Sequence, residues 1–266
     1  MFRPTSLLQL LLLLSIPVSA AQQYSYKVLE KKSLAPDRFV QGLEIIDSKL
    51  YLSSGGYGKS TLQRFDFSSG ELELERKLDP RLFAEGLTVL GDRVYQLTWQ
   101  ARLLLVYKKD DLSAVARMQI PGEGWGLTND GKQLIYSDGS DRLYFLSPDE
   151  HRITRAINVT LGGRPVTRLN ELEWIDGRIW ANIWQTDHIV VINPVDGSVE
   201  RSLNLQGLLP VMERRPDTDV LNGIARNPAD GSVWVTGKNW PWMYRIEVVD
   251  APTDSQASTP GAPKTR

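Results

Sequence analysis

The sequence repeats one pattern of short strands five times, and this repeat limits the fold more than any other feature. An aromatic residue marks the same place in every repeat, a few residues after a Gly-Leu or similar pair: Tyr51, Tyr95, Tyr136, Trp180 and Trp234. The spacings between them are 44, 41, 44 and 54 residues. A period of about 40–50 residues built from short strands is typical of a β-propeller with one blade per repeat. The sequence therefore predicts an all-β, five-bladed β-propeller.

Each repeat divides into four strands separated by turns that contain Gly or Asp. In the first repeat we expect them at Gly42–Ile46, Lys49–Ser54, Thr61–Phe67 and Glu71–Leu78. β-branched and aromatic runs bounded by such turns are the usual signature of strands. The fifth repeat ends after Trp242–Val248 and lacks a fourth strand.

The missing strand is expected at the other terminus. The segment Tyr24–Leu34 stands before the first repeat in the same way that the fourth strand of one repeat stands before the start of the following repeat. The step from Leu34 to Gln41 is seven residues, the same as the step from Leu78 to Glu85. The N-terminal strand is therefore predicted to complete the last blade and to close the ring without a free edge.

The two ends of the chain do not resemble the repeats. Residues 1–20 carry one Arg, the apolar run Leu7 to Leu14 and the small residues Val18-Ser19-Ala20, a pattern typical of a secretory signal peptide. Cleavage is expected after Ala20 or Ala21. Residues 250–266 are rich in Pro, Ser, Thr, Ala and Gly and are predicted to be a disordered tail. We therefore expect an exported protein, periplasmic or secreted, with a propeller domain at 24–249 and no membrane attachment after cleavage.

Composition excludes several classes of function. A net charge of −1 argues against electrostatic binding to nucleic acid. The absence of Cys excludes thiol catalysis and thiolate metal sites. The two histidines, His151 and His188, have no partner at ligand spacing, which argues against a zinc centre or a Ser-His-Asp triad. A closed ring has no evident need for a partner, so we expect a monomer.

Propeller geometry predicts where the functional side chains lie. The start of each first strand and the end of each second strand meet at one mouth of the central channel. The starts carry Gln41, Glu85, Trp125, Asn170 and Asn222, and the ends carry Trp99, Asp138, Trp184 and Lys238. One mouth is thus expected to gather a carboxylate, amides, an ammonium group and three indoles.

Positions at which one repeat carries a different residue type from the other repeats are candidates for function, whereas positions that keep the same type are candidates for packing. Glu85 stands where the preceding repeat has Gln41, and a carboxylate at a channel mouth usually has a task or a partner. Trp99, Trp125 and Trp184 also break the pattern, so we expect them to be walls of a pocket. Trp180 and Trp234 keep the pattern and are expected in the core. Lys238, taken alone, fits a solvated loop equally well.

Eight ordered motifs carry a resemblance to a known family. They are F-V-Q-G-L (39–43), F-A-E-G-L-T (83–88), Y-Q-L-T-W (95–99), G-W-G-L-T-N-D-G (124–131), L-N-E-L-E-W (169–174), A-N-I-W-Q-T-D (181–187), L-N-G-I-A (221–225) and T-G-K-N-W-P (236–241). Together they resemble the plant-type (type I) glutaminyl-peptide cyclotransferases, or glutaminyl cyclases. The resemblance covers about residues 26–248 with the motifs in family order.

The resemblance implies conversion of the N-terminal Gln of a peptide or protein to pyroglutamate with release of ammonia. It implies a catalytic set of Glu85, Lys238, Asn170 and Gln41 and a substrate-binding set of Phe39, Phe83, Trp99, Trp125 and Trp184. In this reading Glu85 carries the proton from the attacking α-amine to the departing ammonia. No cofactor is required for catalysis, and a structural calcium ion in the channel is compatible with it.

Two other classes of function remain open from the sequence. Glu85, Asn170 and Asn222 could bind Ca²⁺ as in propeller lactonases and esterases, with Asp138 as the one evident further ligand. A non-catalytic binding propeller is the other alternative, although it would not need a Glu facing three Trp and a Lys.

Overall fold

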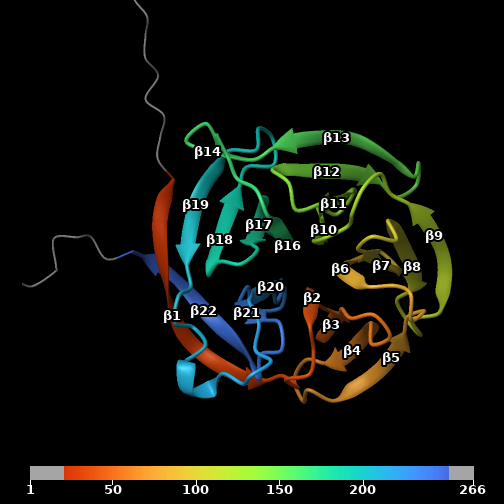
Figure 1. Cartoon of the computed structure of the whole chain (residues 1–266), viewed down its shortest axis with the longest axis horizontal. Coiled ribbons are helices and arrows are strands. Elements are labelled where there is room, and N and C mark those ends of the chain that lie inside the picture. The colour runs from red at the N-terminus through yellow and green to blue at the C-terminus, as the bar shows by residue number, and fades with distance from the viewer. Residues whose placement is uncertain (1–20, 252–266) are drawn as a thin grey trace, which may run out of the picture.

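In a computed structural model, residues 21–251 form a ring of β-sheets around one central axis (Figure 1). Within these residues the only helical segment is the 3-10 turn η1 (Val211–Glu213), which lies in the long loop between the strands at 199–204 and 221–226. No helix in this part of the chain is long and apolar enough to cross a membrane. The all-β prediction is confirmed, whereas the predicted signal peptide at 1–20 lies outside the described residues.

Three sheets contain four antiparallel strands each, ordered along the sequence from the centre of the ring to its rim (Figure 1). The first sheet contains β2 (Val40–Ile46), β3 (Lys49–Ser54), β4 (Thr61–Asp66) and β5 (Leu72–Lys77). The second contains β6 (Ala84–Leu90), β7 (Arg93–Thr98), β8 (Leu103–Lys108) and β9 (Ala114–Gln119). The third contains β10 (Leu127–Asn129), β11 (Leu134–Ser137), β12 (Arg142–Ser147) and β13 (Arg152–Asn158). A small hairpin follows, made of β14 (Thr160–Leu161) and β15 (Arg164–Pro165).

The remaining strands form one eight-stranded sheet in the order β16-β17-β18-β19-β1-β22-β21-β20. Its first half contains β16 (Leu169–Ile175), β17 (Arg178–Ile183), β18 (His188–Ile192) and β19 (Val199–Asn204). Its second half contains β20 (Leu221–Arg226), β21 (Val233–Gly237), β22 (Trp242–Asp250) and β1 (Gln22–Ser33).

The N-terminal strand joins the two halves of this sheet. β1 pairs antiparallel with β22, with Tyr24 opposite Asp250, and it also pairs parallel with β19, with Gln22 opposite Arg201. The expected pairing of the N-terminal strand with the last strand is therefore present. The strands reach from Gln22 to Asp250, slightly beyond the predicted limits of 24 and 249. Asp250 thus belongs to β22 rather than to the tail, and residues 252–266 lie outside the described part of the chain.

Burial falls from the centre of the ring to the rim. Six of the seven residues of β2 are buried, and the same holds for β6, whereas most of β5 and β9 is exposed. The aromatic residues that mark the repeat lie in the second strand of each unit and are all buried: Tyr51, Tyr95, Tyr136, Trp180 and Trp234. The assignment of Trp180 and Trp234 to the core is confirmed, and all five residues pack in the apolar clusters between neighbouring units.

Neighbouring first strands approach each other too closely for side chains at the contacts. A Cβ atom on Gly42 would lie 2.4 Å from the backbone nitrogen of Leu87, and one on Gly86 would lie 2.4 Å from that of Leu127. Glycine is required at such positions because it lets two backbones come into contact. These contacts bring β2, β6 and β10 together around the channel.

Glu171 stands at the corresponding place in β16 and makes the contact with its carboxylate instead. It is fully buried, and its two oxygens accept the backbone N–H groups of Leu43 at 3.2 Å and Ile224 at 2.8 Å. Burial raises the pKa of Glu171 well above its usual range, and the charge of Glu173 raises it further. β16 is thereby linked to both β2 and β20.

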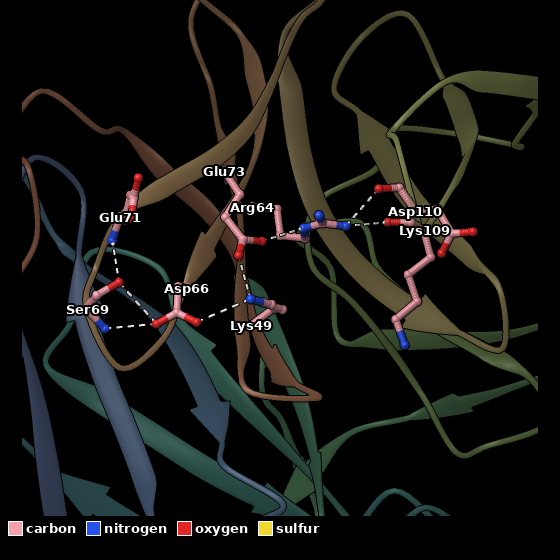
Figure 2. Close-up of polar contacts among 8 residues, drawn as sticks. All are labelled: Lys49, Arg64, Asp66, Ser69, Glu71, Glu73, Lys109 and Asp110. Atoms are coloured by element: carbon pink, nitrogen blue, oxygen red, sulfur yellow. Dashed lines mark hydrogen bonds and ion pairs between the residues drawn. The ribbon is translucent and has the colours of Figure 1, made fainter.

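A polar network joins the first sheet to the second at the opposite end of the strands from the site described below (Figure 2). Arg64 of β4 donates to Glu73 at 3.0 Å, and its Nη1 donates to the carbonyl oxygens of Lys109 and Asp110, both at 2.9 Å. Lys49 lies 2.5 Å from the same Glu73. Because charged groups here bridge two sheets, the network helps to fix their relative position.

Candidate active site

β-bulges place the polar side chains at one mouth of the channel. The pairing of first and second strands jumps from Val40 to Gly42, from Ala84 to Leu87, from Leu169 to Leu172 and from Leu221 to Ile224. The residues skipped include Gln41, Glu85, Asn170 and Asn222. A bulge redirects side chains out of the regular alternation of a strand and is common beside functional sites. The bulges explain why polar residues stand in strands that are otherwise apolar.

A repeated backbone hydrogen bond holds the residues that follow the second strands beside the starts of the first strands. Trp99 donates its N–H to Phe83 at 3.0 Å, Trp184 to Arg168 at 2.9 Å and Lys238 to Val220 at 2.9 Å. The next residues, Gln185 and Asn239, have positive φ angles of 62° and 59°. Non-glycine residues rarely adopt this conformation, which turns the chain sharply after Trp184 and Lys238.

These elements enclose a cavity of about 320 Å³. Its walls are formed by Phe39, Gln41, Phe83, Glu85, Trp99, Trp125, Asn170, Trp184, Gln185, Asp219 and Lys238. All nine residues of the predicted catalytic and substrate-binding sets line this single cavity. Gln185 and Asp219 are additions that the repeat register did not indicate, since both lie in loops beyond the aligned strands.

Two other residues predicted for the mouth lie outside the lining. Asp138 is engaged in its own turn, where it accepts hydrogen bonds from Ser140 and, at 3.0 Å, from the hydroxyl of Tyr144. Asp138 therefore stands at the end of its second strand as expected, but its carboxylate is used by local hydrogen bonds and does not line the cavity. Asn222 lies behind Gln41, and its Nδ2 donates to the oxygen of that side chain at 3.3 Å.

Glu85 is the buried carboxylate of the cavity, with only 5% of its surface exposed. Burial raises the pKa of Glu85 well above its usual range, the positive charge of Lys238 opposes that shift, and the negative charge of Glu123 adds to it. Gln41 donates from Nε2 to Oε1 of Glu85 at 3.1 Å. The site therefore holds one oriented carboxyl group with an increased affinity for protons.

Lys238 supplies the positive charge of the cavity. It is 4% exposed, and its Nζ lies 4.8 Å from the centre of the Phe39 ring, in a cation–π arrangement. Burial lowers the pKa of Lys238, while the charges of Glu85 and Asp219 act in the opposite direction. The structure thus places Lys238 inside the cavity and rules out the solvated-loop alternative.

Asn170 offers an amide without an internal partner. Its Oδ1 is buried and has no hydrogen-bond partner among residues 21–251. Buried polar atoms are almost always paired, so an unpaired amide oxygen on a residue of the cavity wall is unusual and makes Asn170 a candidate for ligand binding. Asn170 lies on β16 and Gln41 on β2, two of the inner strands of the ring (Figure 1).

Aromatic rings form the rest of the wall through edge-to-face contacts. The ring of Phe83 lies 6.1 Å from Phe39 and 5.7 Å from Trp99, and Trp125 lies 5.5 Å from Trp184. Edge-to-face pairs at such distances are favourable and define the position of each ring. The cavity therefore has rigid apolar walls around a small set of polar groups, as is usual for small-ligand sites.

Glu123 lies behind two of these walls and was missed by the sequence analysis. Its Oε2 accepts the indole N–H of Trp99 at 2.8 Å and that of Trp125 at 3.1 Å. No pattern in the sequence singled it out, since Glu123 lies in the loop before β10 and a carboxylate in a loop is usually solvated.

Gly139 lies against the indole ring of Trp125, where a side chain would collide with it. Its φ is +81°, and a Cβ atom there would lie 2.7 Å from Cζ2 of the Trp125 ring. Both the backbone conformation and the space thus require glycine. The turn after β11 therefore contributes a bare backbone surface against which the indole rests.

The described residues offer no evident metal centre of the usual kind. Between residues 21 and 251 no three His, Cys, Asp or Glu side chains are arranged to hold a metal ion. The ligands considered for calcium are partly engaged, since Glu85 and Asn222 are both bonded to Gln41.

Comparison with known proteins identifies the family. The model of the glutamine cyclotransferase family matches residues 5–248. The chain belongs to the glutamine cyclotransferase family. The resemblance found in the motifs is therefore confirmed, and the cavity lies within the part of the chain that this family shares.

Individual relatives agree with this result. A protein of Arabidopsis thaliana named glutaminyl-peptide cyclotransferase is 40% identical over 226 residues, which cover 83% of this chain and 70% of the relative. The crystal structure of Myxococcus xanthus glutaminyl cyclase superimposes with a TM-score of 0.80 at 31% identity and covers 87% of this chain and 100% of that chain. The WD40 β-propeller domain of Doa1 matches with a TM-score of 0.50 at 10% identity, over 78% of this chain and 63% of that chain, and shows a likeness of fold alone.

Proposed function

We propose that this member of the glutamine cyclotransferase family is a glutaminyl-peptide cyclotransferase, which converts the N-terminal Gln of a peptide or protein to pyroglutamate and releases ammonia. The observation that carries the proposal is the single cavity that combines buried Glu85, Lys238 and unpaired Asn170 within aromatic walls. The names of the Arabidopsis and Myxococcus relatives support the same activity.

The reaction is intramolecular and needs one group that both accepts and donates a proton. The α-amine of the substrate attacks the carbon of its own γ-carboxamide, which forms the ring C–N bond, and the bond to the amide nitrogen then breaks. Glu85 takes one proton from the attacking amine and gives it to the departing nitrogen, so ammonia leaves and the carboxylate is restored. A carboxyl group with a raised pKa suits this task, because its proton affinity is closer to that of the amine.

The other polar groups hold the carboxamide and the charge that develops on its oxygen. Lys238 can donate to that oxygen, and its positive charge favours the oxyanion. The free amide of Asn170 can bind the substrate's carboxamide, and Gln41 keeps Glu85 in its orientation. Correct positioning matters here because the flexible Gln side chain must be folded into a ring-like conformer before it reacts.

The aromatic walls serve binding and selectivity. Phe39, Phe83, Trp99, Trp125 and Trp184 enclose the reacting side chain and limit access of water. Water is the competing nucleophile, since its attack on the same carboxamide would give Glu instead of pyroglutamate. A closed apolar site favours the internal amine over water.

An ammonia-release assay on a Gln-initiated dipeptide, with and without an excess of chelator, tests the proposal. Mass spectrometry of the product separates cyclisation from hydrolysis, because only cyclisation loses ammonia without taking up water. The matched control is the same dipeptide with an acetylated α-amine, which lacks the nucleophile and is expected to stay intact. Failure to release ammonia under either condition would remove the proposed activity.

The chelator arm also tests the alternative of a calcium-dependent hydrolase. We propose that catalysis needs no cofactor, so activity is expected to survive exhaustive chelation. A structural calcium ion in the channel is compatible with this, and its loss would lower thermal stability rather than turnover. Loss of all activity on chelation, restored by Ca²⁺, would favour the hydrolase-type site.

The proposal also covers the number of blades, the cellular location and the oligomeric state. Three four-stranded sheets and the two halves of the eight-stranded sheet support a five-bladed propeller whose last blade is completed by β1. The apolar run and small residues within 1–20 support cleaved export to the periplasm or beyond. The substrates would then be exported or external peptides and proteins that begin with Gln, processed by a monomer.

A further inference from the structure

We propose that Glu123 is a positioning residue of this site, whose carboxylate holds two of the indole walls in place from behind. The inference rests on the proposed function for its kinetic consequences, whereas its structural part is independent of the activity. Glu123 does not line the cavity, so it would act through Trp99 and Trp125 and not by touching the substrate.

The geometry is a three-way contact between separate elements. Trp99 follows β7 of the second sheet, Trp125 precedes β10 of the third, and Glu123 lies in the loop between β9 and β10. One oxygen of Glu123 accepts both indole N–H groups, at 2.8 Å and 3.1 Å. Each contact between an ionised carboxylate and an N–H donor is stronger than a neutral hydrogen bond.

The arrangement has a direct effect on the shape of the cavity. An indole can donate only through Nε1, so binding that atom to Glu123 fixes which edge of each ring points away from the substrate. The ring faces and carbon edges of Trp99 and Trp125 are then left to form the wall. Trp125 also contacts Trp184 edge-to-face, so its position affects a third wall residue.

The negative charge of Glu123 also affects the pKa of the Glu85 carboxyl group. The charged groups that act on Glu85 are Lys238, at the end of β21, and Glu123, and Glu123 raises the pKa of Glu85 while Lys238 lowers it. Gln41 on β2, which donates to Glu85, is neutral, and Asp219, which lines the same cavity, acts on Lys238. Removal of the charge of Glu123 is therefore expected to lower the pKa of Glu85.

Two variants separate these effects. Glu123→Gln keeps an oxygen that can accept both indoles but removes the charge, whereas Glu123→Ala removes both. Glu71→Gln is the matched control, because Glu71 is an exposed carboxylate just before the outer strand β5. Steady-state kinetics across pH, tryptophan fluorescence and thermal unfolding are measured for wild type and the three variants.

For Glu123→Gln we expect a KM close to that of the wild type and an acidic limb of the kcat/KM profile that moves to lower pH. For Glu123→Ala we expect the same movement together with an increase in KM of about tenfold, since two donors lose their acceptor. The tryptophan emission of Glu123→Ala is expected to change, whereas Glu71→Gln matches the wild type in every measurement. If Glu123→Ala does not fold, Glu123→Asp takes its place, because its shorter side chain draws the carboxylate back from both indoles and should also raise KM.

A double-variant comparison tests whether Glu123 acts through the indoles. In a Trp99→Phe background, Glu123→Ala should raise KM by a smaller factor than in the wild type, because one of its two partners is already absent. Wild-type KM, pH profile and emission in both Glu123 variants would overturn the inference. Absence of ammonia release by the wild type would instead overturn the proposed function, while the fluorescence comparison would still judge the role of Glu123.

Discussion

The side-chain amide of Gln41 lies 3.1 Å from Oε1 of Glu85 and so connects the starts of two neighbouring first strands. Asn222 holds Gln41 in turn, through its Nδ2. A chain of two amides thus runs from β20 through β2 to the carboxylate on β6. Because each member lies in a bulge of its own strand, the ring itself sets the orientation of Glu85 before any substrate binds.

Glu85→Gln is expected to reduce kcat by about 10²–10⁴-fold, the usual contribution of a general acid–base group. The change keeps the shape of the side chain and removes its ability to exchange a proton, so circular dichroism and the thermal midpoint should stay close to those of the wild type. Glu44→Gln, a change at another buried glutamate that does not line the cavity, is the control and should retain full activity. Near-normal ammonia release by Glu85→Gln would show that another group carries the proton.

Trp184→Ala is expected to raise KM by about tenfold or more, since it removes a wall and the edge-to-face partner of Trp125. The effect on kcat should be smaller, because the proton-transfer groups stay in place. Trp174→Ala serves as the control, because Trp174 lies on β16 but is not part of the cavity lining. An unchanged KM for Trp184→Ala, measured with the Gln dipeptide, would contradict its role as a wall.

Gly139→Ala tests how far the walls depend on bare backbone. The added Cβ would lie 2.7 Å from the Trp125 ring at a φ of +81°, so it should displace the indole and raise KM several-fold. Gly131→Ala has a similar φ of +87° but open space around the Cβ, so it reports the backbone strain alone. Gly131→Ala should lose about 1 kcal/mol in free energy of unfolding from backbone strain, and Gly139→Ala should lose more because of the added contact with the ring. Only Gly139→Ala should change KM.

The register of the repeat was sufficient to predict most of the site. Because every unit uses the same four strands, the starts of first strands and the ends of second strands could be aligned from Gly turns and buried aromatic residues. Glu85 and Lys238, 153 positions apart in the sequence, could be placed at one mouth on this basis. The N-terminal pairing with β22 followed from the same register, since a missing strand at one end matched an extra one at the other.

The repeat register could not predict the hydrogen bonds that individual side chains make. Asp138 occupies the right place in the repeat, but the hydroxyls of Ser140 and Tyr144 bind its carboxylate within the turn. Glu123 lies outside the aligned strands, and only the three-dimensional structure shows that two indoles from different sheets meet at its oxygen. Such choices among hydrogen-bond partners depend on distances that a sequence repeat does not encode.

Glu44 provides a pH-dependent term in the stability of the ring. It is buried, and its Oε2 accepts the N–H of Val89 from the next first strand at 2.8 Å. Burial raises the pKa of Glu44 from 4.5 to about 7, whereas bonds from Thr88 and Val89 and the charge of Lys109 act in the opposite direction. The folded protein therefore holds this proton more tightly than the unfolded chain does.

Stability should accordingly fall as pH rises from about 4.5 to about 7, the interval between the unfolded and folded pKa values of Glu44, and this loss should persist above that range. Glu44→Gln removes the titration but keeps an oxygen for Val89. We expect the difference in free energy of unfolding between pH 5 and pH 8 to shrink by about 1–3 kcal/mol in this variant. Urea unfolding followed by tryptophan fluorescence at the two pH values measures it, with Glu71→Gln as the exposed control. Equal pH dependence in Glu44→Gln and wild type would mean that Glu173, whose pKa the charge of Glu44 raises, holds the proton instead.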